Sequence, residues 1–370
     1  MPFIVASVLV LAVVATPLLT MRVGLPTDGS NATSTTERKA WDLLADGFGA
    51  GINGPILVLA TYPGGATAAD ARGLAARVGG LPDVATVLPA QTKGGDVLLT
   101  VLPTRGPSSA STTALVTRLR SGTTADGLGG GPRVSVTGET AVDIDISDKV
   151  ASALPLYLAL VAGFAFLLLM VVFRSILIPI KATISFLLSL GASLGGVVAV
   201  FQWGWFAGPL GVVPGPLLSF LPIIVTGVLF GLSMDYEMFL VSGIRERHLH
   251  GDGPRDAVVN GFVTGAQVVA AAGLIMIGVF SGGALPGDPT SQPIAFALAL
   301  GVLLDAFVVR MTLVPAVLAL FGGGAWLLPR WLERVLPRVD FDGEALQAGL
   351  DRATSLHGAA APQPVGAARP

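Results

Sequence analysis

Four residues able to carry protons or charge lie in two of the most apolar stretches of the sequence: Asp235, Tyr236, Asp305 and Arg310. Asp235 comes ten residues before Arg245, which corresponds to about 15 Å along an α-helix. Asp305 likewise follows eleven residues after the apolar Ile294. A charged group in the middle of a bilayer costs several kcal/mol and is usually functional. Since burial favours a neutral carboxyl group and a nearby arginine favours its charged form, we expect these four residues to form a proton relay.

Glycines precede both carboxylates at helical spacing. Gly227, Gly231 and Asp235 are four residues apart, and Gly301 stands four residues before Asp305. Residues at this spacing share one face of a helix, and small residues allow membrane helices to approach closely. We therefore expect the three glycines to mediate helix packing and both carboxylates to point into the bundle.

The spacing of the charges also suggests which of them pair. Arg310 stands five residues after Asp305, about 140° around an α-helix, so we expect Arg310 to contact Asp235 on a neighbouring helix. Glu237 falls nearly opposite Asp235, and a structural or lateral role is at least as plausible for it. A static Asp–Arg clamp that merely holds the bundle together is the alternative to a relay.

The composition requires a membrane. Hydrophobic residues make up 52% of the 370 positions and charged residues only 12%, against about 25% charged in a typical soluble domain. Apolar runs long enough to cross the hydrocarbon core predict about six transmembrane helices. The first lies within residues 1–21, and five more form a bundle over residues 151–322, near 154–173, 182–201, 218–242, 258–281 and 293–321.

Lysine and arginine fall in alternate connections between these runs. The first and third connections of the bundle contain Arg174, Lys181, Arg245, Arg247 and Arg255, whereas the second and fourth contain no basic residue. Basic residues are enriched in cytoplasmic loops. We therefore expect a location in the cytoplasmic membrane, with both termini in the cytoplasm and residues 22–150 outside.

The region 22–150 has the pattern of an α+β domain. Short runs rich in Val, Ile and Thr predict strands and two amphipathic stretches predict helices, in the order β-α-β-β-α-β of a ferredoxin-like split βαβ unit. The strands are expected at 55–61, 84–90, 96–102 and 133–138, and the helices at 66–79 and 108–120. Residues 323–340 suggest an interfacial helix, and residues 341–370, rich in Ala and Pro, a disordered tail.

Several functional classes are disfavoured. The chain has no cysteine and only three histidines, all outside the apolar runs, so we expect no metal site and no cofactor apart from a proton gradient. The net charge of −2 gives no case for nucleic acid. No hydrolase motif is convincing, and an arginine close to Asp235 and Asp305 disfavours an aspartyl protease dyad. An enzyme is therefore not expected.

A set of longer motifs resembles a known family. The stretches GFGAGINGPILV, VTGETAVDID, VVFRSILIPIKA, GLSMDYEMFLVSGIRER, GVLLDAFVVRMTLVPAVLAL and LPRWLERVLP are similar to the C-terminal half of MmpL-type transporters of the resistance-nodulation-division superfamily. The resemblance implies one helix, a porter-like domain and five further helices. It also implies proton-driven export or flipping of lipids or other hydrophobic molecules. By motif, Asp235 and Tyr236 match the family's Asp-Tyr relay pair, and Asp305 and Arg310 the polar pair of the last helix.

One departure from this family matters. Its members carry two such halves, whereas this sequence has one. The chain is then a fragment, a split half that needs a partner, or a half-size protein that pairs with itself. A non-transporting scaffold or secretion-accessory subunit of the same superfamily is the alternative function. Membrane lipids or hydrophobic small molecules are the expected partners, and the sequence does not single out one cargo.

Overall fold

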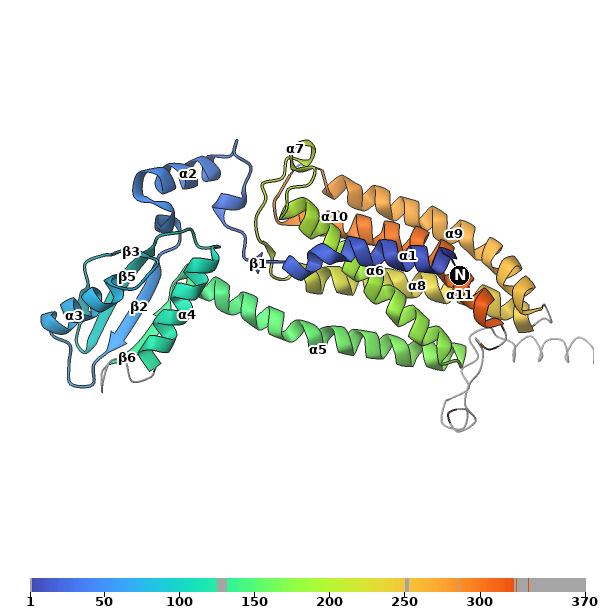
Figure 1. Cartoon of the computed structure of the whole chain (residues 1–370), viewed down its shortest axis with the longest axis horizontal. Coiled ribbons are helices and arrows are strands. Elements are labelled where there is room, and N and C mark those ends of the chain that lie inside the picture. Colours follow the sequence, from blue (N-terminus) through green and yellow to red (C-terminus); the bar gives the residue numbers. More distant parts are fainter. Residues whose placement is uncertain are drawn as a thin grey trace, which may run out of the picture.

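The computed structural model describes residues 2–124, 132–249, 253–285 and 287–322, together with Gly324 and Leu332. The interfacial helix predicted at 323–340 and the tail predicted at 341–370 lie outside the described residues, apart from those two positions. Figure 1 shows a sheet-containing domain at one end of the long axis and a helical bundle at the other. We call these parts the α/β domain and the bundle.

Six helical rods within the described ranges are long and apolar enough to cross a membrane. They are α1 (Pro2–Ala15) with its continuation η1 (Thr16–Thr20), α5 (Glu139–Phe173), α6 (Leu177–Phe201), α8 (Leu221–Leu249), α9 (Pro254–Gly283), and a last rod built from α10 (Ser291–Leu303), the π-helical η4 (Leu304–Leu313) and α11 (Val314–Phe321). The outer helices expose large apolar side chains, as lipid-facing helices do. The protein is a multi-pass membrane protein.

Helix α6 lies in the middle of the bundle, with most of its side chains buried. It packs against α1, α5, α10 and η4. Its crossing with α1 depends on Gly195, where an added Cβ atom would collide with the backbone of Val14 and Ala15. A small residue at this point therefore brings the two backbones together, as is common between membrane helices.

One helix is longer than the apolar pattern predicts. The apolar run starts near residue 154, but α5 begins at Glu139 and continues for 35 residues through Pro155. Residues 139–153 mix apolar residues with five charged ones, so their mean hydropathy is too low to mark a membrane helix, yet no glycine or proline interrupts them. The helix therefore extends from the bundle into the α/β domain and connects the two (Figure 1).

The α/β domain is built on one antiparallel sheet in the order β3-β5-β2-β6, with the short β4 paired to β5. The strands are β2 (Ile56–Thr61), β3 (Val84–Val87), β4 (Gln91–Lys93), β5 (Asp96–Pro103) and β6 (Arg133–Thr137). In β2 the side chains of Ile56, Val58 and Ala60 are buried in alternation, as expected for a sheet with one covered face. The apolar sides of α3 (Ala68–Gly79) and α4 (Ala110–Thr124) complete that core.

Local signals explain where the helices of this domain begin. Helix α3 starts with a capping box, in which the Thr67 side chain accepts from the Asp70 amide and the Asp70 carboxylate accepts from the Thr67 amide. The preceding helix α2 (Thr36–Phe48) is capped by the Thr35 side chain alone, which accepts from the Arg38 amide.

A short parallel pairing holds the α/β domain against the bundle. Strand β1 (Val23–Gly24) pairs with β7 (Leu217–Leu218), which follows the short helix α7 (Ala207–Leu210). Next to it the Gln202 side chain accepts from the Arg22 amide at 3.1 Å and donates to the Arg22 carbonyl. The buried hydroxyls of Ser147 and Ser219 also lie 2.7 Å apart. These contacts fasten α5 and the end of α1 to the loop between α6 and α8.

Candidate functional site

Four charged side chains from three elements meet inside the bundle. Lys181 comes from α6, Glu237 from α8, and Asp305 and Arg310 from η4. Their exposed fractions are 7%, 3%, 7% and 2%, respectively. Burial of an unpaired charge costs several kcal/mol, whereas a paired and hydrogen-bonded set can be accommodated. We call these four residues the buried charge set; it contains two positive and two negative groups.

Arg310 lies at the centre of this set. Its Nε atom donates to Asp305 Oδ2 at 2.9 Å and its Nη1 atom to Glu237 Oε2 at 3.2 Å. Its Nη2 atom donates to both the carbonyl and the hydroxyl of Ser233, the latter at 2.8 Å. The Tyr236 ring centroid lies 5.6 Å from the guanidinium carbon, within cation–π range. All three nitrogens of the planar fork are used, so its orientation is fixed.

The contact between Asp305 and Arg310 was not expected from α-helical geometry. The two residues lie in η4, where the backbone is π-helical. Hydrogen bonds in a π-helix run between residues five apart, which brings positions 305 and 310 above one another. The prediction of poor pairing assumed an α-helix and is wrong for this reason.

Glu237 was underestimated by the sequence argument. Its Oε1 atom accepts from Lys181 Nζ at 2.5 Å, while its other oxygen accepts from Arg310. Glu237 therefore connects two cations from two different elements. Glu237 stands four residues after Ser233 and shares its face of α8, but the spacing alone does not say that this face is the inward one. Lys181, which was assigned to a connection, lies buried within α6.

Asp235 lies on the other side of α8. It is exposed, and in the described part of the chain it makes no ion pair or hydrogen bond with another side chain. Two residues on a helix turn by about 200°, so the inward position of Glu237 forces Asp235 outward. The expectation that Asp235 points into the bundle and contacts Arg310 is therefore wrong for this chain. Tyr236, between them, is partly buried and reaches the buried charge set.

The three predicted packing glycines differ in their surroundings. A Cβ atom at Gly301 would lie 2.5 Å from Leu229 Cδ1, and one at Gly227 would lie 3.0 Å from the Tyr157 hydroxyl. At Gly231 a Cβ atom would meet nothing within 4 Å. Gly231 and Asp235 thus form an open strip along the outer face of α8.

A small cavity lies beside the buried charge set. It has a volume of about 10 Å³, and its polar lining comes from Ser189, Ser233, Tyr236 and Asp305. This size is about the minimum for one water molecule, and the polar groups that line it could hold one. On the same side of α6, Ser193 donates to the Ala297 carbonyl at 2.6 Å, while the buried Ser185 hydroxyl has no hydrogen-bond partner among the described residues. Ser185, Ser189 and Ser193 thus place a row of hydroxyl groups along α6, and Ser189 lines the cavity next to Asp305.

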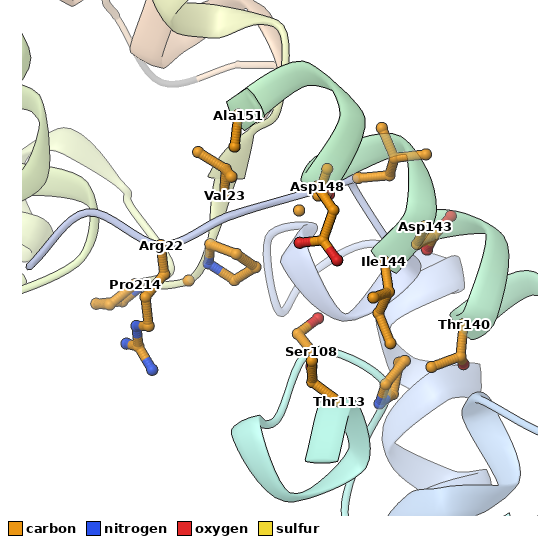
Figure 2. Close-up of a pocket in the computed structure, with 16 residues that line it drawn as sticks. Arg22, Val23, Ser108, Thr113, Thr140, Asp143, Ile144, Asp148, Ala151 and Pro214 are labelled. Carbon is orange, nitrogen blue, oxygen red and sulfur yellow. The ribbon is translucent and has the colours of Figure 1, made fainter. Parts of the chain in front are cut away.

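A larger pocket of about 400 Å³ lies where the α/β domain meets the bundle. Figure 2 shows Ser108 and Thr113 on one side of it and Asp143 and Asp148, from α5, on another. Pro214 and its neighbours close the side towards the bundle. Hydroxyl and carboxylate groups beside apolar surface suit the polar head of an amphiphile. We call this the junction pocket.

Comparisons with known proteins agree with this architecture. A sequence model described as "MMPL family" matches residues 66–340. "Membrane protein YdfJ" of Bacillus subtilis (strain 168) is 43% identical over 351 residues, which is 92% of this chain and 47% of that protein. "Heme uptake protein MmpL11" of Mycobacterium tuberculosis (strain ATCC 25618 / H37Rv) is 38% identical over 91% of this chain and 35% of its own length.

The name of a further relative mentions a different transported molecule. "Mycolic acid-containing lipids exporter MmpL11" of Mycolicibacterium smegmatis (strain ATCC 700084 / mc(2)155) is 35% identical over 91% of this chain and 36% of its own length. The chain spans about half or less of the curated relatives that it matches. The resemblance drawn from the motifs is confirmed, and this chain belongs to the MMPL family.

Proposed function

We propose that this chain is one half of a transporter that uses the proton gradient to export or flip lipids or other hydrophobic molecules across the cytoplasmic membrane. The observation that carries the proposal is the buried charge set around Arg310, with Asp305 held at 2.9 Å from Nε. Groups of this kind are rare in membrane helices and commonly serve ion or proton pathways.

The charge set has the properties that a proton switch needs. Asp305 is held by Arg310 and lies against a cavity that would admit a water molecule. The charges of the buried charge set sum to zero, so protonation of Asp305 would leave the set with a charge of +1. Because an unbalanced charge is costly at this depth, the helices that carry the partners, α6 and α8, would have to rearrange. Tyr236 can donate or accept a hydrogen bond during this change.

Asp235 supports the proposal of a second half. An unpaired carboxylate on the outer face of a membrane helix is unfavourable against lipid, so we propose that this face meets protein. Gly231, with free space above it, allows another backbone to approach. The partner is a second MMPL-like half or a second copy of this chain, and in the latter case the strip would meet itself across a two-fold axis. Asp235 and Tyr236 would then join the relay at the interface.

The cargo is proposed from chemistry and from the named activities of relatives. One relative is named for mycolic-acid-containing lipids and another for heme, and both molecules are largely apolar with a polar part. The junction pocket lies beside the bundle and offers polar groups at its walls. We propose that it receives the polar end of a lipid while the tails remain in the membrane.

The orientation and the type of the α/β domain belong to the same proposal. The alternation of basic residues along the connections favours cytoplasmic termini, with the α/β domain outside. The strand order β3-β5-β2-β6 with two helices on one core supports a ferredoxin-like, porter-type module. Such a domain would pass the lipid onwards after it leaves the bundle.

The proposal is tested with the full chain in proteoliposomes that contain fluorescent phosphatidylethanolamine. The expected result is that an imposed pH gradient accelerates movement of the labelled lipid between leaflets, and that an uncoupler abolishes the acceleration. Lipid movement that ignores the gradient would contradict proton coupling. Absence of any lipid movement, with intact insertion and self-association, would favour the scaffold function.

A further inference from the structure

We propose that Lys181 is a positioning residue that sets the charge balance against which Asp305 takes up its proton. This inference rests on the proposed function, because it concerns the same proton site. Lys181 does not contact Asp305 in the structure, and it acts through Glu237 and Arg310. It gives a role to a buried cation outside the four residues predicted to form the proton relay.

The contacts form an unbroken chain. Lys181 Nζ lies 2.5 Å from Glu237 Oε1, the other oxygen of Glu237 lies 3.2 Å from Arg310 Nη1, and Arg310 Nε lies 2.9 Å from Asp305 Oδ2. All four groups are almost completely buried, so solvent screens their mutual interactions weakly. A charge removed at one end is therefore felt at the other.

Few other titratable groups face this site. Tyr236 and Glu237 approach it from α8 and Lys181 from α6, while Asp235 points away from it. Helices α1, α10 and α11 contain no titratable residue. Helix α9 has such residues, Arg255 and Asp256, only in its first turn. Among the described residues, the charged groups next to Asp305 are therefore the other three members of the buried charge set.

The balance of charge predicts how each variant behaves. In the wild type the set sums to zero, and a proton on Asp305 makes it +1. Lys181→Met makes the starting sum −1, so proton uptake neutralises it and becomes easier. Glu237→Gln makes the starting sum +1, so uptake becomes harder. The double variant K181M/E237Q returns to zero and should behave like the wild type.

A purely structural role predicts a different pattern. If Lys181 and Glu237 only fastened α6 to α8, both single variants would weaken the protein in the same direction. Neither single variant would then move the midpoint of the Asp305 titration in a direction set by its charge, and the double variant would have no shift to cancel. Opposite shifts that cancel are therefore specific to charge balance.

The experiment is infrared titration of the full chain in lipid nanodiscs. The protonated carboxyl band that disappears in Asp305→Asn reports Asp305, and the pH at which this band reaches half its height is compared between variants. We expect Lys181→Met to move that pH upwards by about one unit or more, Glu237→Gln to move it downwards, and the double variant to cancel the shifts. No shift, or shifts of the same sign, would overturn the inference.

Two further variants keep the test decisive. If Lys181→Met fails to insert, Lys181→Gln also removes the positive charge but keeps a polar partner for Glu237, and it should still move the midpoint upwards, whereas Lys181→Arg keeps the charge and should leave the midpoint unchanged. An unmoved midpoint in Lys181→Gln, or a moved one in Lys181→Arg, contradicts the inference. The outcome also separates the two proposals. A band that never titrates between about pH 5 and pH 9 contradicts the proton site itself, whereas a titrating band that ignores Lys181 contradicts only the role of Lys181.

Discussion

Arg310 and Asp305 are five residues apart on one helix, yet the Nε atom of Arg310 donates a 2.9 Å hydrogen bond to the Asp305 carboxylate. The π-helical segment Leu304–Leu313 makes this possible. The same guanidinium also reaches Glu237 and Ser233 on α8. The Arg310 side chain thus connects η4 to α8. The planar geometry of its guanidinium group matters as much as its charge.

Arg310→Lys should therefore strongly slow transport although it keeps the charge. Lysine has no planar fork and cannot serve three acceptors at fixed angles, and hydrogen bonds to charged groups contribute about 1.5 to 3 kcal/mol each. We expect at least about a tenfold loss in lipid movement, equal to roughly 1.4 kcal/mol. The proteoliposome assay with an imposed pH gradient measures it.

Arg245→Lys provides the matched control. The Arg245 side chain donates to the Val172 carbonyl through Nη1 at 2.7 Å, and a lysine can also make this hydrogen bond. We expect this variant to transport lipid at nearly the wild-type rate. Equal losses in the two variants would show that the fork at position 310 has no special role.

Gly231→Leu should weaken association between chains. The free space above this glycine is where we place the partner helix, and a leucine would push that helix away. Gly163→Leu on α5 is the control, because Gly163 is also exposed and has no heavy atom within 4 Å of its Cβ position. Native mass spectrometry from nanodiscs measures the dimer fraction, which should fall only in Gly231→Leu.

Gly261→Ala should destabilise the bundle. A Cβ atom there would lie 2.6 Å from Ile244 Cα and 2.8 Å from the Gly243 carbonyl oxygen, so α8 and α9 would have to separate. Forcing extra atoms into a packed contact costs about 1 to 3 kcal/mol. Unfolding in detergent should show this loss for Gly261→Ala and not for Gly278→Ala, where nothing lies within 4 Å. Equal stability of both variants would contradict the close crossing.

Thr113→Trp should obstruct the junction pocket. Thr113 lines the pocket and is exposed on α4, so an indole can occupy the space without disturbing a core. We expect about a tenfold slower movement of labelled lipid, the effect of roughly 1.4 kcal/mol of lost binding. Thr117→Trp, one turn further along the same helix and not part of the lining, should leave the rate unchanged. A similar rate in both variants would remove this pocket from the lipid path.

Much of the architecture follows from periodicity. The apolar runs give the six membrane rods because each must span the hydrocarbon core, and the alternating Val, Ile and Thr runs give the strands because one face of the sheet is buried. The apolar runs did not predict the first part of α5, because a helix that continues into water needs no long apolar run. Residues 139–153 contain five charged residues and no glycine or proline, so the helix continues without an apolar run.

The site was predictable only in part. The sequence gives the identity of the charged residues at mid-helix, since their rarity in apolar runs is visible without a structure. Their pairing was not predictable, because the π-helical turn at 304–313 rotates Arg310 onto Asp305. Nor could periodicity decide which of Asp235 and Glu237 faces inwards, because both faces of α8 contain small or polar residues.

The most direct measurement of the central claim compares Asp305→Asn with the wild type while proton uptake and lipid movement are recorded together in the same proteoliposomes. Asparagine has nearly the same shape and can still accept from Arg310, but it cannot take up a proton. The account predicts that both signals disappear in this variant while insertion and α-helical content remain. Proton-coupled lipid movement at the wild-type rate in Asp305→Asn would contradict it.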